Sequence, residues 1–480
     1  MKFYSTLIIL IILILLISCN SIINKKRITK STNTITTKNS IIKNNINTIA
    51  NSNNNNINLS RYDKSLSKVL IVLLPLLYFI SVSLNHVALP KVVNLAINNN
   101  IHVSQNSAST YGILSGIDAM FTFLSVNLIG ILSDKYGRKR FMIYSCMGLA
   151  LSFTVIINAS SSIYFYIAAM IDGLSSVMFS QAQAYVADID RITNNHSNSN
   201  SNSNSNSVKI KRVGESLSRF QGISVGLGYV IGILSGSLLM TKLGVLSPLY
   251  LGISLLILSS ILITVFLPET VQRQGKAIKY TEANPLGALV LLARNKSMLI
   301  CSISYFFLNL SIAGIQGIWI NYLDYKFKWG IVKNASTLVV QYSLISIMPK
   351  ILNKLFGPSN TVICALLIHS ISVLALASAN TDTSIFIIMI FLAAGVSASP
   401  SLLGYLTDQV DDSETGALQG SVDTIRTITI AISHPIISKI FANTMNVHDN
   451  QLNPFYLCSL FSFIAFSVYA IEWINKKRYI

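Results

Sequence analysis

Twelve stretches of mostly apolar residues, each close to 20 residues long, constrain this chain more than any other feature. A helix of about 20 residues, rising about 1.5 Å per residue, crosses a hydrocarbon core about 30 Å thick. With 51% hydrophobic and only 11% charged residues, the chain has more apolar surface than a water-soluble core can cover. We therefore predict an all-α integral membrane protein with twelve spans. The stretches lie near 69–89, 109–132, 141–158, 162–184, 218–240, 246–267, 298–321, 333–353, 360–378, 384–406, 417–440 and 453–474.

Lysine and arginine residues are unevenly distributed among the predicted loops. They gather after spans two, four, six and twelve, and the positive-inside rule places such loops in the cytoplasm. Lys326, Lys328 and Lys333, after span seven, run against this trend. The bias predicts that both ends of the twelve-span core face the cytoplasm. It also accounts for much of the formal charge of +18 without a nucleic-acid partner.

The N-terminal residues 1–19 form a separate hydrophobic segment. Lys2 precedes an apolar run at 7–17, a pattern that predicts a secretory signal peptide. Because more positive charge follows this run than precedes it, an uncleaved anchor with its N-terminus outside is an equal alternative. The Asn-, Ser- and Thr-rich stretch 20–64 has too little apolar surface to fold, and we expect a disordered tail.

The rest of the chain divides at a long central loop, 271–297. Six spans precede this loop, within 65–270, and six follow it, within 298–475. A Ser-Asn repeat at 194–207 is predicted to be a flexible insertion between spans four and five. Six plus six spans are typical of a transporter built from two helical bundles.

A short basic turn joins spans two and three and is a candidate gating motif. Gly130 and Gly137 allow close helix approach and a bend, and Asp134 is placed to accept hydrogen bonds or to pair with a cation. Arg138 and Lys139 supply positive charge at the membrane surface. A positive-inside signal alone explains the basic residues but not the two glycines and the aspartate at this spacing.

Five glycines in span five follow a spacing suited to helix packing. Gly222, Ser224 and Gly226 also match the GxSxG pattern of a hydrolase, but that motif needs a turn between a strand and a helix. The pattern lies inside an apolar helix, so helix packing is the better interpretation. The packing glycines are Gly222, Gly226, Gly228, Gly232 and Gly236.

The sequence GILSDKYGRKRFM at 130–142 resembles the loop 2–3 signature of the major facilitator superfamily, GxLaDrxGrkxxl. Further motifs resemble the tetracycline-resistance-type exporters and the hippocampus abundant transcript-like carriers. They are AYVADI with Asp188, Leu267-Pro-Glu269, Ala283-Asn-Pro-Leu, and GALQG at 416–420 followed by Arg426. The resemblance covers 65–475. It implies two six-helix bundles, alternating access and a substrate near the bilayer midplane, and it gives Asp188 as the partner of the basic turn.

Two departures from the family pattern bear on the transport mechanism. Many proton-coupled members carry an arginine four residues before the glycine that corresponds to Gly173, and Ala169 stands at that position here. The antiporter signature of span five expects Gly-Pro, whereas Tyr229 follows Gly228. Coupling through that arginine is therefore excluded, and export by antiport loses its usual motif.

Charged residues inside the predicted spans are the candidate binding groups, because such charges are costly in a membrane. Asp118 and Asp172 each lie sixteen residues before Asp134 and Asp188 respectively, which places them at a similar depth. Span four lines the cavity in the family that the motifs resemble, so Asp172 is the leading candidate for substrate or proton binding. A hydrogen bond to a neighbouring helix explains Asp172 equally well.

Arg426 has two candidate partners. Span two packs beside span eleven in the family, so Asp118 is one partner across the two bundles. Asp423, three residues before Arg426, is the other and is slightly favoured. We also expect Asp188 to contact Arg138 and to brace the cytoplasmic face in an outward-open state.

Three functions fit these features: a secondary transporter of a small organic solute, with or without a coupled proton; an uncoupled facilitator; and a transporter-like sensor or scaffold. The expected partners are a small-molecule substrate, the bilayer and, in the coupled case, a proton. No motif predicts an enzyme, a cofactor or a metal site. His369 and His434 are better explained by packing than by proton relay. The sequons at Asn158 and Asn334 suggest glycosylated outward loops.

Overall fold

The computed structural model describes residues 64–98, 102–186, 188, 205–270, 289–410, 415–445 and 453–478. The predicted leader 1–19 and nearly all of the predicted tail lie outside these ranges, as do most of the Ser-Asn insertion and of the central loop. All the described residues belong to the second of the two units into which the chain divides, 63–480.

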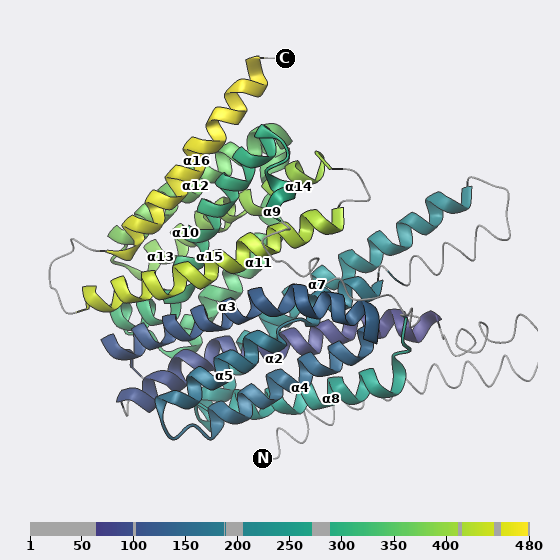
Figure 1. The fold of residues 1–480 in the computed structure, drawn as a ribbon. Coiled ribbons are helices and arrows are strands. Elements are labelled where there is room, and N and C mark those ends of the chain that lie inside the picture. The colour runs from purple at the N-terminus through teal and green to yellow at the C-terminus, as the bar shows by residue number, and fades with distance from the viewer. Residues whose placement is uncertain are drawn as a thin grey trace, which may run out of the picture. The chain divides into compact units, whose positions relative to one another are not determined.

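The first group of helices contains six long elements and is drawn in purple to teal in Figure 1. α2 packs on α7 and α8, while α3 and α4 pack on α5. Their bounds are α2 Lys64–Asn98, α3 Gln105–Tyr136, α4 Arg138–Ile157, α5 Ser162–Ser175, α7 Ser205–Leu243 and α8 Ser247–Phe266. We call this group the N-terminal half.

The second group, green to yellow in Figure 1, forms the C-terminal half. α10 packs on α15 and α16, and α12 packs on α13 and α16. The bounds are α9 Leu289–Leu292, α10 Lys296–Phe327, α11 Ile331–Phe356, α12 Pro358–Ser378, α13 Asp382–Val396, α14 Ala398–Thr407, α15 Thr415–Thr444 and α16 Pro454–Arg478.

Within the described ranges, 11 helices are long and apolar enough to cross a membrane, or up to 12 when the bent α11 counts as one span. α11 bends by 45° between Ile345 and Ile347. Pro349 explains this bend, because its ring clashes with the carbonyl four residues earlier and removes a helical hydrogen bond. The prediction of a twelve-helix, strand-free membrane fold is confirmed.

Three predicted segments differ in detail from the structure. The predicted span 162–184 is interrupted where α5 ends at Ser175, before helix resumes at Met178. The predicted span 384–406 is divided between α13 and α14 at Ser397. α7 begins at Ser205, inside the predicted Ser-Asn insertion. Hydropathy measures apolar length, so it does not detect a local break in the backbone.

Glycines let α7 approach α2 closely, as predicted for part of the glycine series. A Cβ at Gly228 would lie 2.9 Å from Phe79, and one at Gly232 would clash with Ser83. Ser83 Oγ also donates a hydrogen bond to the Gly228 carbonyl at 3.2 Å. A Cβ at Gly236 would lie 3.1 Å from the Leu84 side chain.

The packing prediction is wrong for Gly226, because a Cβ there would meet no described atom within 4 Å. The surroundings of Gly222 lie outside the described side chains. Ser224 is buried inside the continuous helix α7, so it lacks the turn that a hydrolase nucleophile needs. The series therefore contributes packing at three of its positions.

The two halves meet along α3 and α15, which run antiparallel. Gly112, near the beginning of α3, packs on Ser438, and Gly116 packs on Pro435. Near the opposite end of the same two helices, a Cβ at Gly130 or at Gly420 would meet no described atom within 4 Å. The predicted close approach at Gly130 is therefore not made with any described residue, and the close glycine contacts between α3 and α15 lie toward one end.

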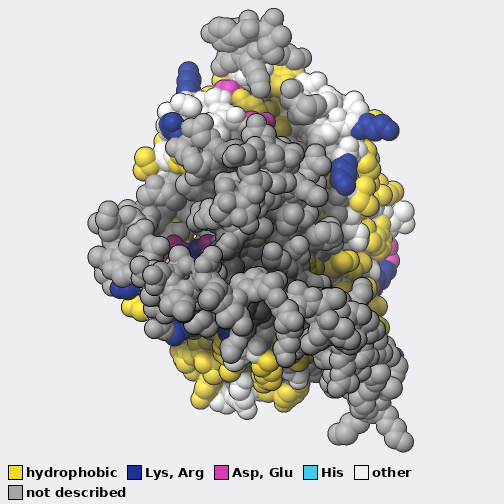
Figure 2. Space-filling model, turned by 90° about the vertical axis from the view of Figure 1, so that its right-hand side faces the viewer, with side chains coloured by type: hydrophobic (Ala, Val, Ile, Leu, Met, Phe, Trp, Pro, Cys, Tyr) yellow, Lys and Arg dark blue, Asp and Glu magenta, His cyan; other side chains and the backbone are white. Residues whose placement is uncertain are grey.

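Large apolar side chains cover the outward surfaces of the helices. Figure 2 shows hydrophobic side chains along the flanks, with lysine and arginine side chains beside them at the periphery of this view. Leu151 and Ile261 are each 53% exposed. Contact of such apolar side chains with water is unfavourable, whereas contact with the acyl chains of a bilayer is favourable. This surface fits a multi-pass membrane protein.

Candidate functional site

The predicted gating motif forms a compact ionic cluster at the C-terminal end of α3. Arg138 Nε donates to Asp188 Oδ2 at 3.2 Å, and the guanidinium also pairs with Asp134. Arg138 Nη1 donates to Ser133 Oγ at 2.8 Å. The predicted contact between Arg138 and Asp188 is therefore present. We call these residues, with Glu269, the Arg138 cluster.

Glu269 joins the Arg138 cluster from the segment after α8. The Arg138 backbone N–H donates to Glu269 Oε1 at 2.9 Å, so the carboxylate lies at the positive N-terminus of α4. Gly137 adopts a φ of +105°, and a Cβ there would clash with the Glu269 carboxylate. Lys139 Nζ donates to the Thr264 carbonyl at 2.8 Å. Each of these contacts joins residues of the N-terminal half only.

A second ionic cluster lies at the opposite end of α3 and joins the two halves. Lys91 Nζ of α2 lies 2.9 Å from Asp324 Oδ1 of α10, and the two side chains are 3% and 2% exposed. The Val103 backbone N–H donates to Asp324 Oδ2 at 2.9 Å, and His102 Nδ1 lies 3.3 Å from Asp324 Oδ1. We call these residues the Asp324 cluster.

Apolar packing surrounds the Asp324 cluster and also joins the halves. Ala108 of α3 belongs to one buried cluster with Ile315, Trp319 and Tyr322 of α10, and Val103 packs against it. An ion pair shielded in this way is little screened by salt. This end of the interface between the halves is closed by charge and by apolar contact together.

Sequence reasoning missed the Asp324 cluster. Lys91 and Asp324 are not among the candidate residues, because the pairing depends on which parts of distant helices meet. One signal is present: each is a charged residue within the first span of its half, where charges are rare.

Asp118 and Asp172 lie together at one level of the N-terminal half, as their spacing predicts. A Cβ at Gly173 would clash with the Asp118 carbonyl, so α5 touches α3 beside both aspartates. Ser125 Oγ donates to the Gly173 carbonyl at 3.0 Å and adds to this contact. The two carboxyl groups lie within electrostatic range of each other, and Asp118 Oδ1 is buried without a hydrogen-bond partner among the described residues.

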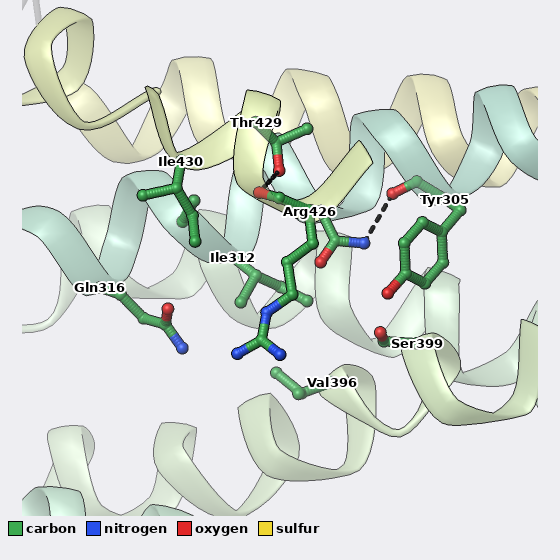
Figure 3. A pocket seen from close by; sticks show the side chains of 10 residues that line it. Tyr305, Ile312, Gln316, Val396, Ser399, Arg426, Thr429 and Ile430 are labelled. Carbon is green, nitrogen blue, oxygen red and sulfur yellow. Dashed lines mark hydrogen bonds between the residues drawn. The ribbon is translucent and has the colours of Figure 1, made fainter. Parts of the chain in front are cut away.

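Arg426 points into a hollow in the C-terminal half, near the middle of α15 (Figure 3). The hollow has a volume of about 140 Å³. Figure 3 shows Gln316 and Ser399 on either side of the guanidinium, with Val396 below it. The lining residues are Tyr305, Asn309, Ile312, Ala313, Gln316, Val396, Ser399, Arg426, Thr429 and Ile430.

Arg426 forms an ion pair with neither of its two predicted partners. No carboxylate of the described residues lies within 4.0 Å of its guanidinium, which excludes a direct pair with Asp118 or Asp423 in this conformation. Asp423 still lies within electrostatic range of Arg426.

Two tyrosines connect the acidic and basic parts of the cavity. Tyr229 of α7 stacks on Tyr342 of α11 with ring centroids 5.1 Å apart, which joins the two halves. Tyr229 also lies within electrostatic range of Arg426, Asp118 and Asp172. His86 of α2 lies on the other side of Tyr229, 5.9 Å away between ring centroids. Tyr229 therefore lies within electrostatic range of candidate residues from both halves.

The remaining predicted residues take structural positions. His369 Nδ1 lies 2.8 Å from Ser462 Oγ, and a Cβ at Gly395 would lie 2.6 Å from the His369 Cβ. A Cβ at Gly317 would lie 3.1 Å from the His434 ring. Both contacts agree with packing, while His369 Nε2 and both ring nitrogens of His434 are buried without a hydrogen-bond partner among the described residues.

The two sequons differ in accessibility. Asn334 is 2% exposed, so the glycosylation suggested for this position is incompatible with the fold. Asn158 is exposed and its side-chain amide donates to the Thr154 carbonyl at 2.8 Å. Asn158 alone of these two keeps an accessible acceptor.

A family model of the Major Facilitator Superfamily matches residues 70–194 and 199–434. The chain is 26% identical over 392 residues to the class H tetracycline resistance protein of Pasteurella multocida, covering 80% of this chain and 92% of that protein. It is 24% identical over 369 residues to the human hippocampus abundant transcript-like protein 1, covering 73% and 67%. The resemblance inferred from the motifs is therefore confirmed.

A solved structure shares the fold at low sequence identity. It is that of a bacterial homolog to the human lysosomal transporter Spinster, in an inward-facing and unoccupied conformation. The TM-score is 0.65 at 12% identity, over 85% of this chain and 97% of that chain. At this identity, the likeness supports the fold.

Proposed function

Since this chain belongs to the major facilitator superfamily, we propose that it moves a small organic solute across a membrane by alternating access between its two halves. The broader class follows from that membership and from the transporter relatives: the chain is a multi-pass membrane transporter with a small-molecule substrate. The solute, the coupling and the access cycle belong to our proposal.

The contrast between the two ends of the interface carries this proposal. The Asp324 cluster and the contacts of Gly112 and Gly116 close one end. At the other end, α3 and α15 leave Gly130 and Gly420 without a described neighbour within 4 Å. A site between two halves that are joined at one end is the geometry of one state in an access cycle.

The positive-inside rule orients this state. Arg138, Lys139 and Arg140 lie at the open end, which favours the cytoplasm for that end. The Asp324 cluster then lies toward the outside or the lumen. We infer that the structure represents an inward-open state, with its outer side closed.

The role expected for Arg138 and Asp188 changes with this assignment. The family motifs predict that their contact braces the cytoplasmic face in an outward-open state, but the pair is formed while the outer end is closed. Because each partner belongs to the N-terminal half, we propose that the Arg138 cluster holds α3, α4 and the end of span four together through the cycle. It then lets the half move as a rigid body.

Asp172 and Asp118 are the proposed proton site. Two neighbouring carboxyl groups inside a membrane favour sharing a proton over carrying two negative charges. The unpartnered Asp118 Oδ1 supports this role. An uncoupled facilitator is the second candidate, favoured by Ala169 and Tyr229 at the two departures from the family pattern.

Transport by the full chain in liposomes tests the proposed function. The vesicles hold a pH dye, and the solutes span cationic drugs, sugars, nucleosides and organic acids. We expect solute-dependent proton flux in the wild type and its loss in Asp172→Asn. Asp408→Asn, an exposed carboxylate at the end of α14, is the matched control and should leave the flux unchanged.

The other outcomes separate the alternatives. Solute uptake without a pH signal, unchanged in Asp172→Asn, would establish a facilitator and contradict coupling. Binding of a solute without its movement by a folded protein would contradict transport and favour the sensor.

A further inference from the structure

Arg426 is a charged residue near the middle of α15 that has no direct ion pair among the described residues. Its guanidinium makes no hydrogen bond and no ion pair with any residue that the structure describes, although its side chain is exposed to the hollow. A guanidinium carries five N–H donors and stays protonated in proteins. In the structure these donors face the hollow. The hollow is therefore suited to a ligand that accepts them.

The polar groups around Arg426 are not already committed to neutralising it. Asn309 Nδ2 donates to the Tyr305 carbonyl at 2.8 Å, and Thr429 Oγ1 donates to the Arg426 carbonyl at 2.7 Å. Neither contact uses the guanidinium. Gln316 and Ser399 flank the guanidinium in Figure 3 and offer further donors to a bound oxygen.

The size of the hollow limits what it can hold. About 140 Å³ is close to the roughly 150 Å³ of an engineered cavity that binds benzene. This is enough for an anionic head group and a few carbons, but too little for a whole drug-sized molecule. The rest of such a solute would extend beyond the hollow.

The charges limit the type of anion. Arg426 is the sole cation among the ten residues that line the hollow. Asp423 lies within electrostatic range of Arg426, and Tyr229 lies within range of Arg426, Asp118 and Asp172. A dianion would meet one positive charge and several carboxyl groups, whereas a monoanion is matched one to one. Arginine forms two parallel hydrogen bonds with a planar carboxylate. Apolar side chains of the lining, among them Ile312, supply a wall beside it.

We propose that Arg426 binds the carboxylate of an amphipathic organic monoanion, and that this anion is the solute class of the transporter. The inference that this anion is transported rests on the proposed function, whereas the inference that Arg426 binds an anion rests on the hollow itself. Gly420, at the open end of the interface, lies six residues before Arg426 on α15, which is about 9 Å along the helix axis.

Ligands that share a substituted aromatic ring and carry an anionic, neutral or cationic head group test this assignment. The full chain in detergent is titrated with alkyl-substituted benzoates, with the corresponding benzamides and with the corresponding benzyltrimethylammonium compounds. Binding is followed by thermal stabilisation, and uptake of the same radiolabelled compounds is measured in liposomes. We expect a benzoate of the series to bind at least tenfold more tightly than its amide, and the ammonium compound not to bind.

Three variants locate the preference on Arg426. Arg426→Gln should remove the tenfold preference for carboxylate over amide, and Arg426→Lys should keep part of it, because lysine retains the charge but not the planar pair of donors. Lys439→Gln removes a positive charge from the exposed surface of the same helix and should leave the preference intact. Circular dichroism and the unfolding temperature establish that each variant is folded, and Arg426→Lys keeps the test decisive if Arg426→Gln does not fold.

The outcomes distinguish this inference from the proposed function. A series in which no benzoate binds, in which amide and carboxylate bind equally, or in which Arg426→Lys and Arg426→Gln both keep the full preference overturns the inference. Equal uptake of the anionic, neutral and cationic compounds overturns the inference but still supports transport. Carboxylate binding that depends on Arg426 without uptake supports the inference and contradicts the proposed function.

Discussion

The two ends of α3 carry ionic clusters of similar composition that do different work. At one end, Lys91 and Asp324 join α2 to α10 and therefore link the halves. At the other end, Arg138 and Asp188 connect elements of one half. The difference shows that an ion pair near a transporter gate acts as a lock only when its partners belong to bodies that move apart. The same chemistry inside one body makes that body rigid.

Burial separates the two clusters as well. Lys91 and Asp324 are 3% and 2% exposed, whereas in the Arg138 cluster Arg138 and Asp188 are 13% and 15% exposed and Asp134 is 61% exposed. A buried pair loses several kcal/mol when one partner is removed, because the other charge is left without compensation. Partly exposed pairs contribute far less. The comparison therefore predicts a large effect of mutation at the Asp324 end and a small one at the Arg138 end.

The largest expected effect is that of Asp324→Asn. It leaves Lys91 buried with its charge uncompensated, at a cost of roughly 3–5 kcal/mol to the closed outer end. The unfolding temperature should fall, or the protein should open at its outer end to hydrate the lysine. The exchange Lys91→Asp with Asp324→Lys should recover part of the loss in thermal unfolding. If Asp324→Asn does not lower the unfolding temperature and the charge exchange does not restore it, the two results together would contradict a lock.

A smaller effect is expected from Gly112→Ala, at the same end of α3. The new methyl group overlaps Ser438 and the His434 carbonyl region of α15, and such overpacking costs about 1–3 kcal/mol. Gly130→Ala, at the open end of α3, is the matched control. It meets no described atom and should stabilise this conformation by roughly 0.5–1 kcal/mol, because alanine favours the helix over glycine. Equal losses in the two variants, measured by thermal unfolding, would break the comparison between the ends.

At the Arg138 end, Gly137→Ala should destabilise the N-terminal half. The residue has a φ of +105°, and its new methyl group would overlap the Glu269 carboxylate. Strain of this kind costs about 1–3 kcal/mol. Gly244→Ala has a similar φ of +98° but open surroundings, so it isolates the backbone strain from the clash. A larger loss of the unfolding temperature in Gly137→Ala than in Gly244→Ala would show that Glu269 matters.

The smallest effect is expected from Asp188→Asn. The amide keeps one acceptor for Arg138 while losing the charge, so the loss of stability should be about 1–2 kcal/mol. Because both partners lie in one half, the balance between inward-open and outward-open states should not change. Spin-label distances between the halves measure that balance. A marked shift toward either state would support a latch between the states instead.

Local patterns and family motifs made much of this molecule predictable. The apolar stretches predicted the spans, because a chain segment that crosses a membrane as a helix satisfies its backbone hydrogen bonds within itself. The spacing from Asp134 to Arg138 and the AYVADI motif predicted the contact between Arg138 and Asp188. These features depend on residues that are close in sequence or on motifs that are characteristic of the fold.

Contacts between the halves were not predictable from one sequence. The pairing of Lys91 with Asp324 depends on how two helices, more than 200 residues apart in the chain, are set in register. The lack of a direct partner for Arg426 among the described residues likewise depends on which way its side chain turns. The spacing of three residues between Asp423 and Arg426 predicted a direct pair that is not formed. Periodicity identifies a helix, but it does not fix the rotation of one helix against another.

Spin-label distances at both ends of the interface test the central claim most directly. One label pair replaces Ser160 and Thr383 at the outer end, and the other replaces Arg140 and Lys354 at the cytoplasmic end, in a chain whose native cysteines are replaced. We predict short outer and long cytoplasmic distances in the wild type, with the outer distance lengthening in Asp324→Asn and not in Asp188→Asn. A long outer distance in the wild type, or identical distances in the wild type and in Asp324→Asn, would contradict the account.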